Sequence, residues 1–364
     1  MVNIKYIKNG KNTNRFLDGI RGYSALFVAF YHAMLFTQYK VQYSPNFALN
    51  VLQKFTSVGY ISVSVFIVLS GYCLAIPVVR NNLQMKGGFK RYIKRRAKRI
   101  IPPYYFALLL SILSIIFIPT LQKISGTAWD SKIPINAENI FAHFLLIHNL
   151  NRDWLYKING AHWSVATEWH IYFLFPIMLY LWREKNIFVM LCFFFLLTAF
   201  LYKLVPFSSP QFILLFLMGV IAAYFSFNEY RIQVKKIYLY INLLSFIPVL
   251  ILAHFHFPAT PVVQVLFGVL FSIFLFLLVK LRLEGRPSNL DLALSSKVPT
   301  FLGKISYSLY LIHGPFLALS NLVLLKHYHL EYDLQLLVMW CIVVPVIIFI
   351  SYLFYILVER HFLN

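Results

Sequence analysis

The chain has 364 residues, of which 60% are hydrophobic and only 12% are charged, and its formal net charge is +21. Soluble domains keep about a quarter of their residues charged, so this composition excludes an ordinary soluble protein. The basic residues collect in short loops between apolar stretches, a pattern that indicates membrane topology and excludes nucleic acid as a partner.

Apolar stretches of about 20 residues, each long enough to cross a bilayer, follow one another from Phe16 almost to the last residue. They predict an all-α, polytopic integral membrane bundle of about ten transmembrane helices, forming a single domain over residues 1–364. In chain order we expect these helices near residues 17–39, 57–79, 100–121, 163–182, 186–205, 210–227, 238–256, 261–281, 299–324 and 334–357.

Two polar breaks separate the early helices, a basic segment over residues 80–99 and a long loop over residues 122–162. When alternate loops are assigned to opposite sides, most lysines and arginines fall on the side of the N-terminus. We therefore expect both termini and the basic segment in the cytoplasm, and the long loop outside a bacterial cell membrane. The three cysteines are far apart without metal-ligand spacing, so we expect no metal.

Three ionisable residues lie in the first predicted helix, where burial in a bilayer makes them candidates for function. Asp18 and Arg21 are three residues apart on one face. His32 follows Arg21 by eleven residues, or three turns plus about 20 degrees, so both side chains are expected to face one cavity roughly 16 Å apart. His32 can accept a proton from a hydroxyl. Two structural readings remain open, a single buried hydrogen bond for His32 and an Asp18–Arg21 ion pair.

The basic segment ends in Arg95, Arg96 and Arg99 at the start of the third predicted helix. Such a segment can serve only to set topology and contact anionic lipid headgroups. Arg96 and Arg99, however, occupy adjacent turns of one helical face, where paired guanidinium groups could bind the phosphates of a nucleotide-bearing donor.

The fourth predicted helix begins with Trp163, which we expect to line the pocket together with Asp18, and it carries Glu168 about five residues below the outer surface. His32 lies at a similar depth, so we expect Glu168 to meet it and to raise its basicity. The alternative is a Glu168 that only forms a hydrogen bond with a neighbouring hydroxyl or indole.

In the ninth predicted helix, Ser306, Tyr310 and His313 lie four and three residues apart and form one stripe. This stripe could line a sugar pocket, or it could only form hydrogen bonds with neighbouring helices.

The residues above resemble those of acyltransferase family 3, integral membrane enzymes marked by an arginine and a histidine separated by ten residues in the first helix. Arg21 and His32 reproduce this spacing. The resemblance covers the whole chain in order, through residues 17–22, 65–72, 96–104, 163–176, 306–313 and 358–360.

The resemblance implies a ten-helix bundle that transfers an acyl group, commonly acetyl from acetyl-CoA, to a hydroxyl of a surface glycan or related glycoside. It assigns essential roles to Arg21 and His32 and a donor-side role to Arg96 and Arg99. Transfer would be direct, with His32 as general base, or would pass through an acyl-histidine. Tyr310 or Ser306 could donate hydrogen bonds to the oxyanion.

We expect the stand-alone form of the family, without an extracytoplasmic esterase-like domain, and acyl-CoA as a substrate in place of a tightly bound cofactor. The expected partners are acyl-CoA, a carbohydrate acceptor and membrane lipids. The competing class is a transporter or flippase for a glycan or lipid-linked sugar, in which the embedded charges would form a substrate path.

Overall fold

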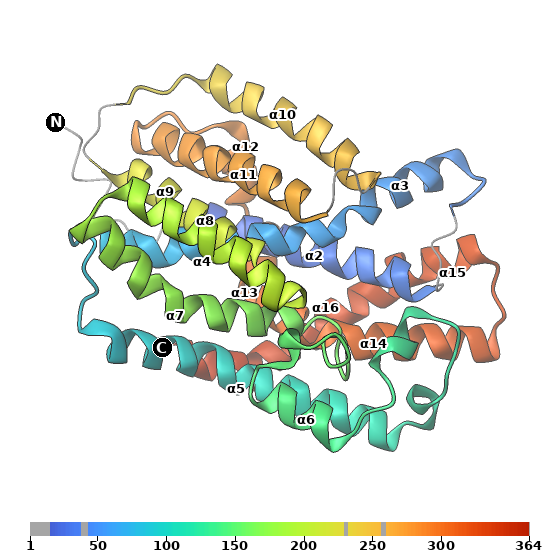
Figure 1. Cartoon of the computed structure of the whole chain (residues 1–364). Helices are drawn as coiled ribbons and strands as arrows, with labels where there is room; N and C mark the ends of the chain where they lie inside the picture. The colour runs from blue at the N-terminus through green and yellow to red at the C-terminus, as the bar shows by residue number, and fades with distance from the viewer. Residues whose placement is uncertain (1–14, 38–42, 229–231, 256–259, 364) are drawn as a thin grey trace.

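The structure is a computed structural model that describes residues 15–37, 43–228, 232–255 and 260–363. Within these ranges the chain is helical and has no strand, which confirms the all-α prediction, and its long helices lie side by side in one bundle (Figure 1). In chain order the helices are α2 (Arg15–Thr37), α3 (Phe47–Ser57), α4 (Ser62–Val79), α5 (Gly88–Phe117), α6 (Ala137–Phe144), α7 (Trp163–Glu184), α8 (Ile187–Leu204), α9 (Gln211–Phe227), α10 (Lys236–His254), α11 (Thr260–Leu283), α12 (Asn289–Leu294), α13 (Lys297–Lys304), α14 (Ser306–His327), α15 (Tyr332–Val338) and α16 (Val344–Leu357).

In the described part of the chain, eight helical segments are long and apolar enough to cross a membrane. Helices α2 and α7, with 23 and 22 residues, have sufficient length but carry charged side chains, among them Arg21 and Glu168. The chain is therefore a multi-pass membrane protein. The prediction of about ten spans includes these two charged helices.

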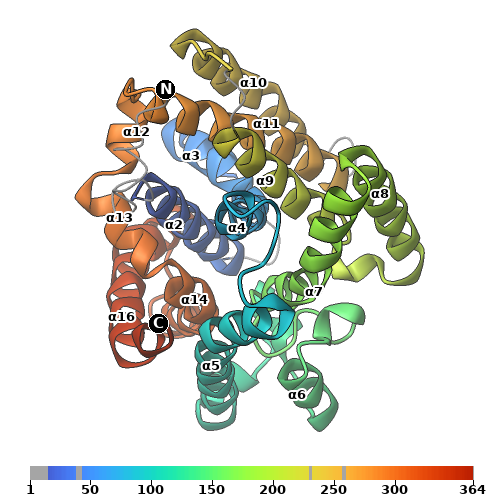
Figure 2. The same cartoon turned by 90° about the vertical axis from the view of Figure 1, so that its left-hand side faces the viewer.

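Helix α4 lies in the middle of the bundle, with α2 and α9 beside it (Figure 2). Its residues are mostly buried and apolar, including Val68, Leu69 and Tyr72. Helices α8 and α10 lie at the rim and expose large apolar side chains such as Leu196 and Leu244. Because lipid is as apolar as these side chains, their exposure is the expected surface of a membrane bundle.

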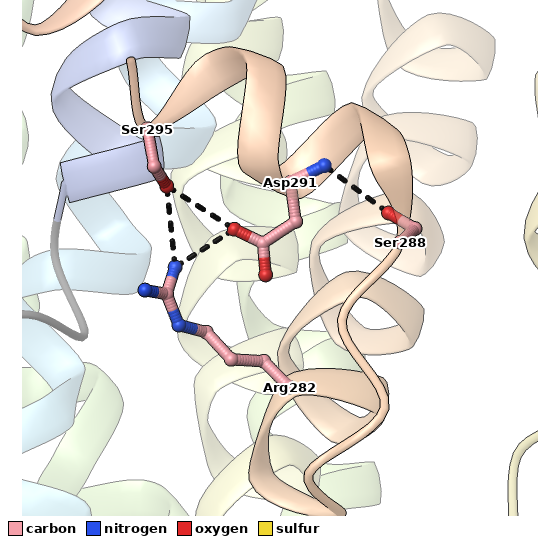
Figure 3. Close-up of polar contacts among 4 residues, drawn as sticks. All are labelled: Arg282, Ser288, Asp291 and Ser295. Atoms are coloured by element: carbon pink, nitrogen blue, oxygen red, sulfur yellow. Dashed lines mark hydrogen bonds and ion pairs between the residues drawn. The ribbon is translucent and has the colours of Figure 1, made fainter. Parts of the chain in front are cut away.

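A polar network fixes the start of α2 against the segment that follows α11 (Figure 3). Arg282 donates hydrogen bonds from Nη1 to Asp291 Oδ1 at 2.7 Å and to Ser295 Oγ at 3.4 Å. The hydroxyl of Ser288 caps α12 by accepting from the Asp291 N–H at 3.1 Å. The Arg282 guanidinium also lies 5.4 Å from the ring centroid of Phe16. The network thus joins α11 and α12 to the helix that carries Arg21 and His32.

Glycines let α2 pack directly against the backbone of α12 and α13. A Cβ at Gly19 would lie 1.9 Å from the carbonyl oxygen of Leu294, and one at Gly303 would lie 2.0 Å from that of Asp18. Neither contact leaves room for a methyl group, and backbone atoms cannot rotate away as a side chain can. The close approach therefore depends on the absence of side chains at these two positions.

We expect Gly303→Ala to destabilise the folded protein by about 1–3 kcal/mol, because the added methyl group pushes α13 away from α2. The measurement is the apparent Tm of purified protein in detergent. Gly268→Ala is the matched control, since its Cβ would meet only the side chains of Leu215 and Met218, at 3.0 Å and beyond. Equal Tm values for the two variants would contradict the account of this contact.

Three predicted helix boundaries were wrong. Helix α5 begins at Gly88, so most of the basic segment is helical, because lysine and arginine favour helices although hydropathy counts them as loop. The predicted helix over 57–79 begins at Ser62, after the separate helix α3. The predicted helix over 299–324 is two helices, α13 and α14, which meet at Ile305 and both pack against α2.

Candidate active site

Two neighbouring cavities lie inside the bundle and share part of their lining, Val63 and Tyr310. The first, with a volume of about 450 Å³, is lined by the arginines of α5 and is called the basic cavity below. The second, with a volume of about 620 Å³, is lined by His32 and His313 and is called the histidine cavity. Both volumes lie within the range of small-molecule sites, so each cavity is large enough to hold a small molecule.

Arg21 and His32 lie in different cavities, which corrects the expectation of a single one. Arg21 lines the basic cavity and His32 the histidine cavity. The helical spacing did bring both to the interior, but Val63 of α4 and Tyr310 of α14 stand between the two spaces.

The basic cavity carries a strong excess of positive charge. Among the described residues that line it, Glu168 is the one acid, whereas the cationic residues are Arg21, Lys86, Arg95, Arg96 and Arg99. The three arginines of α5 therefore line one cavity, as the spacing of Arg96 and Arg99 predicts for those two. The buried Nε of Arg96 has no hydrogen-bond partner among the described residues. A buried guanidinium donor without an acceptor is a place for a ligand's anionic oxygen.

Arg21 is held from two sides. Its Nη1 donates to Asp18 Oδ1 at 3.0 Å, and its Nη2 donates to Cys73 Sγ at 3.0 Å. Asp18 lines neither cavity, so its predicted place in the pocket lining was wrong, and the ion-pair alternative describes its contact. Cys73 had no role in the sequence analysis, because an unpaired cysteine inside an apolar helix carries no recognisable pattern.

Glu168 does not pair with His32. Its carboxylate oxygen Oε1 accepts a hydrogen bond from the Tyr172 hydroxyl at 2.5 Å, and its side chain lines the basic cavity. The reason lies in α7 itself, since residues five apart in a helix point about 140 degrees apart. Trp163 lines the histidine cavity, so Glu168 is turned away from it.

His32 is paired with His313 instead. His32 Nδ1 and His313 Nε2 are 2.6 Å apart, and His313 Nδ1 lies 2.9 Å from the carbonyl oxygen of Leu309. A carbonyl can only accept, so neutral His313 carries its proton on Nδ1 and offers the Nε2 lone pair to His32. His32 must then donate from Nδ1. Its Nε2 is left with a free lone pair, which is the form needed for a general base.

A proline in α14 fixes the loop beside this pair. Pro315 has no N–H, so the carbonyl of Leu311 lacks its helical partner. That carbonyl accepts instead from Asn159 Nδ2 at 2.9 Å and from His162 Nε2 at 3.2 Å. The end of the long loop over residues 122–162 is thereby attached to α14 next to His313.

Tyr310 forms the wall between the cavities. Its hydroxyl lies 2.6 Å from Ser164 Oγ, and its ring meets that of Phe66 edge-on with 5.7 Å between centroids. Ser306 lines the basic cavity, but its hydroxyl donates to the Gly303 carbonyl at 2.8 Å. Of the two oxyanion donors considered from the sequence, Tyr310 is therefore the one that reaches both cavities.

The rest of the histidine cavity is lined mainly by aromatic rings, amides and hydroxyls. Gln211 accepts from the Tyr202 hydroxyl and donates from Nε2 to Gln264 Oε1 at 2.7 Å. Rings that stack and fixed amides are suited to a sugar. Sequence reasoning identified only some of this lining, Trp163, Tyr310 and His313. It missed Tyr31, Lys132, Tyr156, Tyr202, Gln211 and Gln264, which come from separate segments and share no spacing.

Comparison with protein families gives one result that bears on this site. The model of acyltransferase family 3, described as an acyltransferase domain, matches residues 14–356, nearly the whole chain. Neither the curated proteins nor the solved structures yielded a match. The matched region contains every residue that lines the two cavities. The chain therefore belongs to acyltransferase family 3 and is a multi-pass membrane acyltransferase.

Proposed function

We propose that this acyltransferase moves an acyl group, acetyl in the simplest case, from acyl-CoA to a hydroxyl of a cell-surface polysaccharide or related glycoside. One observation carries the proposal. A cluster of guanidinium groups suited to phosphates and an imidazole with a free Nε2 lie in two cavities that meet at a common wall.

The donor would enter the basic cavity from the cytoplasmic side. Arg95, Arg96 and Arg99 would bind its phosphates, and Arg21, already fixed by Asp18 and Cys73, would add a further guanidinium. The pantetheine arm would then extend along the apolar lining toward Tyr310. This places the thioester at the wall, within reach of a group in the histidine cavity.

The acceptor sugar would occupy the histidine cavity from the opposite side. As its hydroxyl oxygen attacks the thioester carbonyl, His32 Nε2 takes the hydroxyl proton and His313 holds the imidazole through Nδ1. The Tyr310 hydroxyl donates to the oxyanion while Ser164 donates to Tyr310. The C–S bond then breaks, and the CoA thiolate receives the proton from His32. The products are the acyl ester and free CoA.

The test is incubation of purified protein in lipid nanodiscs with radiolabelled acetyl-CoA and candidate polysaccharides. We expect labelled glycan and free CoA to appear in equal amounts. A protein that moves a glycan across proteoliposome membranes without releasing CoA would be a transporter, and this result would contradict the proposal.

The His32–His313 pair gives a further prediction. In His313→Phe the ring is kept but the acceptor for His32 Nδ1 is lost, so part of the His32 population moves its proton to Nε2. Because a hydrogen bond of this kind is worth about 1.4 kcal/mol, kcat should fall about tenfold or more. The KM for acetyl-CoA should stay unchanged, since His313 does not line the basic cavity.

His313→Gln is the matched control, because its Oε1 can accept from His32 Nδ1. We expect its kcat to lie between those of the wild type and His313→Phe. Wild-type kcat in a folded His313→Phe protein would show that the pair does not set the His32 tautomer.

A further inference from the structure

Lys132 is a buried cation in the histidine cavity, and the proposed mechanism assigns it no role. It ends a short helical turn, Ala128–Lys132, in the long loop outside the membrane spans. Its side chain is 9% exposed, lines the cavity and lies against Gly160, where a Cβ would be 2.7 Å from Nζ. The Tyr156 ring centroid is 5.1 Å from Nζ. Lys132 therefore lies at the loop side of the cavity that holds His32.

Lys132 has no carboxylate partner among the described residues. Its Nζ donates to Ser131 Oγ at 2.7 Å, which leaves two of its three N–H donors without an acceptor among the described residues. Burial and the positive charge of the neighbouring Lys157 lower the pKa of Lys132 to about 8. At neutral pH the ammonium group is still mostly protonated. A buried charge in these surroundings destabilises the protein unless an anion compensates it.

The rest of the cavity cannot supply that anion. The described lining of the histidine cavity contains no aspartate or glutamate, and His32 and His313 are its other titratable groups apart from tyrosines. The phosphates of acyl-CoA have five cationic residues in the basic cavity, on the far side of the Tyr310 wall. The compensating charge must then come from the molecule that occupies the histidine cavity.

We infer that the acceptor carries an anionic substituent, a carboxylate or a phosphate, which pairs with Lys132 while the reacting hydroxyl lies at His32 Nε2. This inference rests on the proposed function. The acceptor would be an acidic glycan built from uronic acid or phosphorylated sugars. Tyr156 and Trp163 would contact the sugar ring, and the charge would orient the residue so that one hydroxyl meets the base.

The test compares three small glycosides that differ at one carbon. Methyl glucuronide carries a carboxylate, methyl glucoside phosphorylated on its primary hydroxyl carries a phosphate, and methyl glucoside carries neither. Their relative Kd values are measured by competition saturation-transfer NMR on the full-length protein in nanodiscs, without acyl-CoA. We expect one or both anionic glycosides to bind about tenfold more tightly than the neutral one. The stronger of the two anions identifies the source of the charge.

Lys132→Gln should remove this preference and leave the Kd of the neutral glycoside unchanged. Lys157→Gln is the matched control, since this substitution also removes one positive charge near the cavity. In the wild-type protein, Lys157 does not line the histidine cavity, and its Nζ donates to the Ile133 carbonyl at 2.8 Å. Lys132→Arg should retain the preference, because the guanidinium stays charged. If Lys132→Gln does not fold, the three glycosides are compared on wild-type protein with saturating free CoA, which occupies the cationic residues of the basic cavity.

Equal Kd values for all three glycosides on wild-type protein would overturn the inference. The inference would also be overturned if Lys132→Gln lowered kcat by the same factor on an acidic polysaccharide and on its carboxyl-reduced form. That result would mean that Lys132 stabilises the oxyanion and does not bind an acidic substituent. Failure of the proposed function looks different. In that case the anionic preference persists in the binding assay, while no acceptor produces free CoA from acetyl-CoA.

Discussion

His32→Gln is expected to lower kcat for acyl transfer by a factor of about 10² to 10⁴, the usual contribution of a general base. Glutamine cannot take the acceptor's proton, nor can it form an acyl-histidine, so the result holds for direct and for two-step transfer. The KM for acetyl-CoA should change little, because His32 lies outside the basic cavity. The assay is initial-rate release of free CoA by protein in nanodiscs.

The control for His32→Gln is His254→Gln. His254 ends α10, and its Nδ1 lies 3.1 Å from the Ser57 hydroxyl, away from both cavities. This variant should keep near-wild-type kcat and the same elution profile. Near-wild-type transfer by a well-folded His32→Gln protein would show that the reaction uses another base.

The double variant Arg96→Gln/Arg99→Gln is expected to raise the KM for acetyl-CoA by about 10²-fold or more, because each guanidinium contact with a phosphate is worth about 1.5–3 kcal/mol. The KM for the acceptor should stay unchanged. Titration of the initial rate against acetyl-CoA, and separately against the acceptor, measures both values.

Lys94→Gln/Lys98→Gln is the matched control for this double variant. Lys94 and Lys98 lie on the same helix α5, and their substitution removes the same two positive charges. Both side chains are exposed, and neither lines the basic cavity. An equal rise in KM for both double variants would show that net charge near the membrane surface, and not binding in the cavity, attracts the donor.

Hydropathy predicted the membrane bundle and the approximate place of its helices, because burial in lipid requires long apolar segments. It could not predict where helices end when they leave the apolar region. Helix α5 continues through the basic residues back to Gly88, and α13 separates from α14 at Ile305 because Gly303 packs onto the backbone of α2. Such boundaries depend on helix propensity and on packing between helices.

The site was predicted in part for a similar reason. Spacing along one helix placed Arg21 and His32 inward and placed Arg96 and Arg99 on one side of α5, which lines the basic cavity. Contacts between helices could not be read from spacing. The pairing of His32 with His313 depends on how α2 packs against α14, and the position of Lys132 depends on the fold of a loop. The sequence analysis paired Glu168 with His32, and this was wrong. Glu168 and Trp163 are five residues apart in α7, so their side chains point to different sides of that helix.

The central claim is that acyl-CoA and the acceptor meet at the Tyr310 wall. A cryo-EM structure with a thioether analogue of acetyl-CoA, which cannot transfer its acyl group, tests it most directly. The account predicts phosphates beside Arg95, Arg96 and Arg99 and the acyl end against Val63 and Tyr310, facing His32 Nε2. An analogue bound elsewhere, with its acyl end away from this wall, would contradict it.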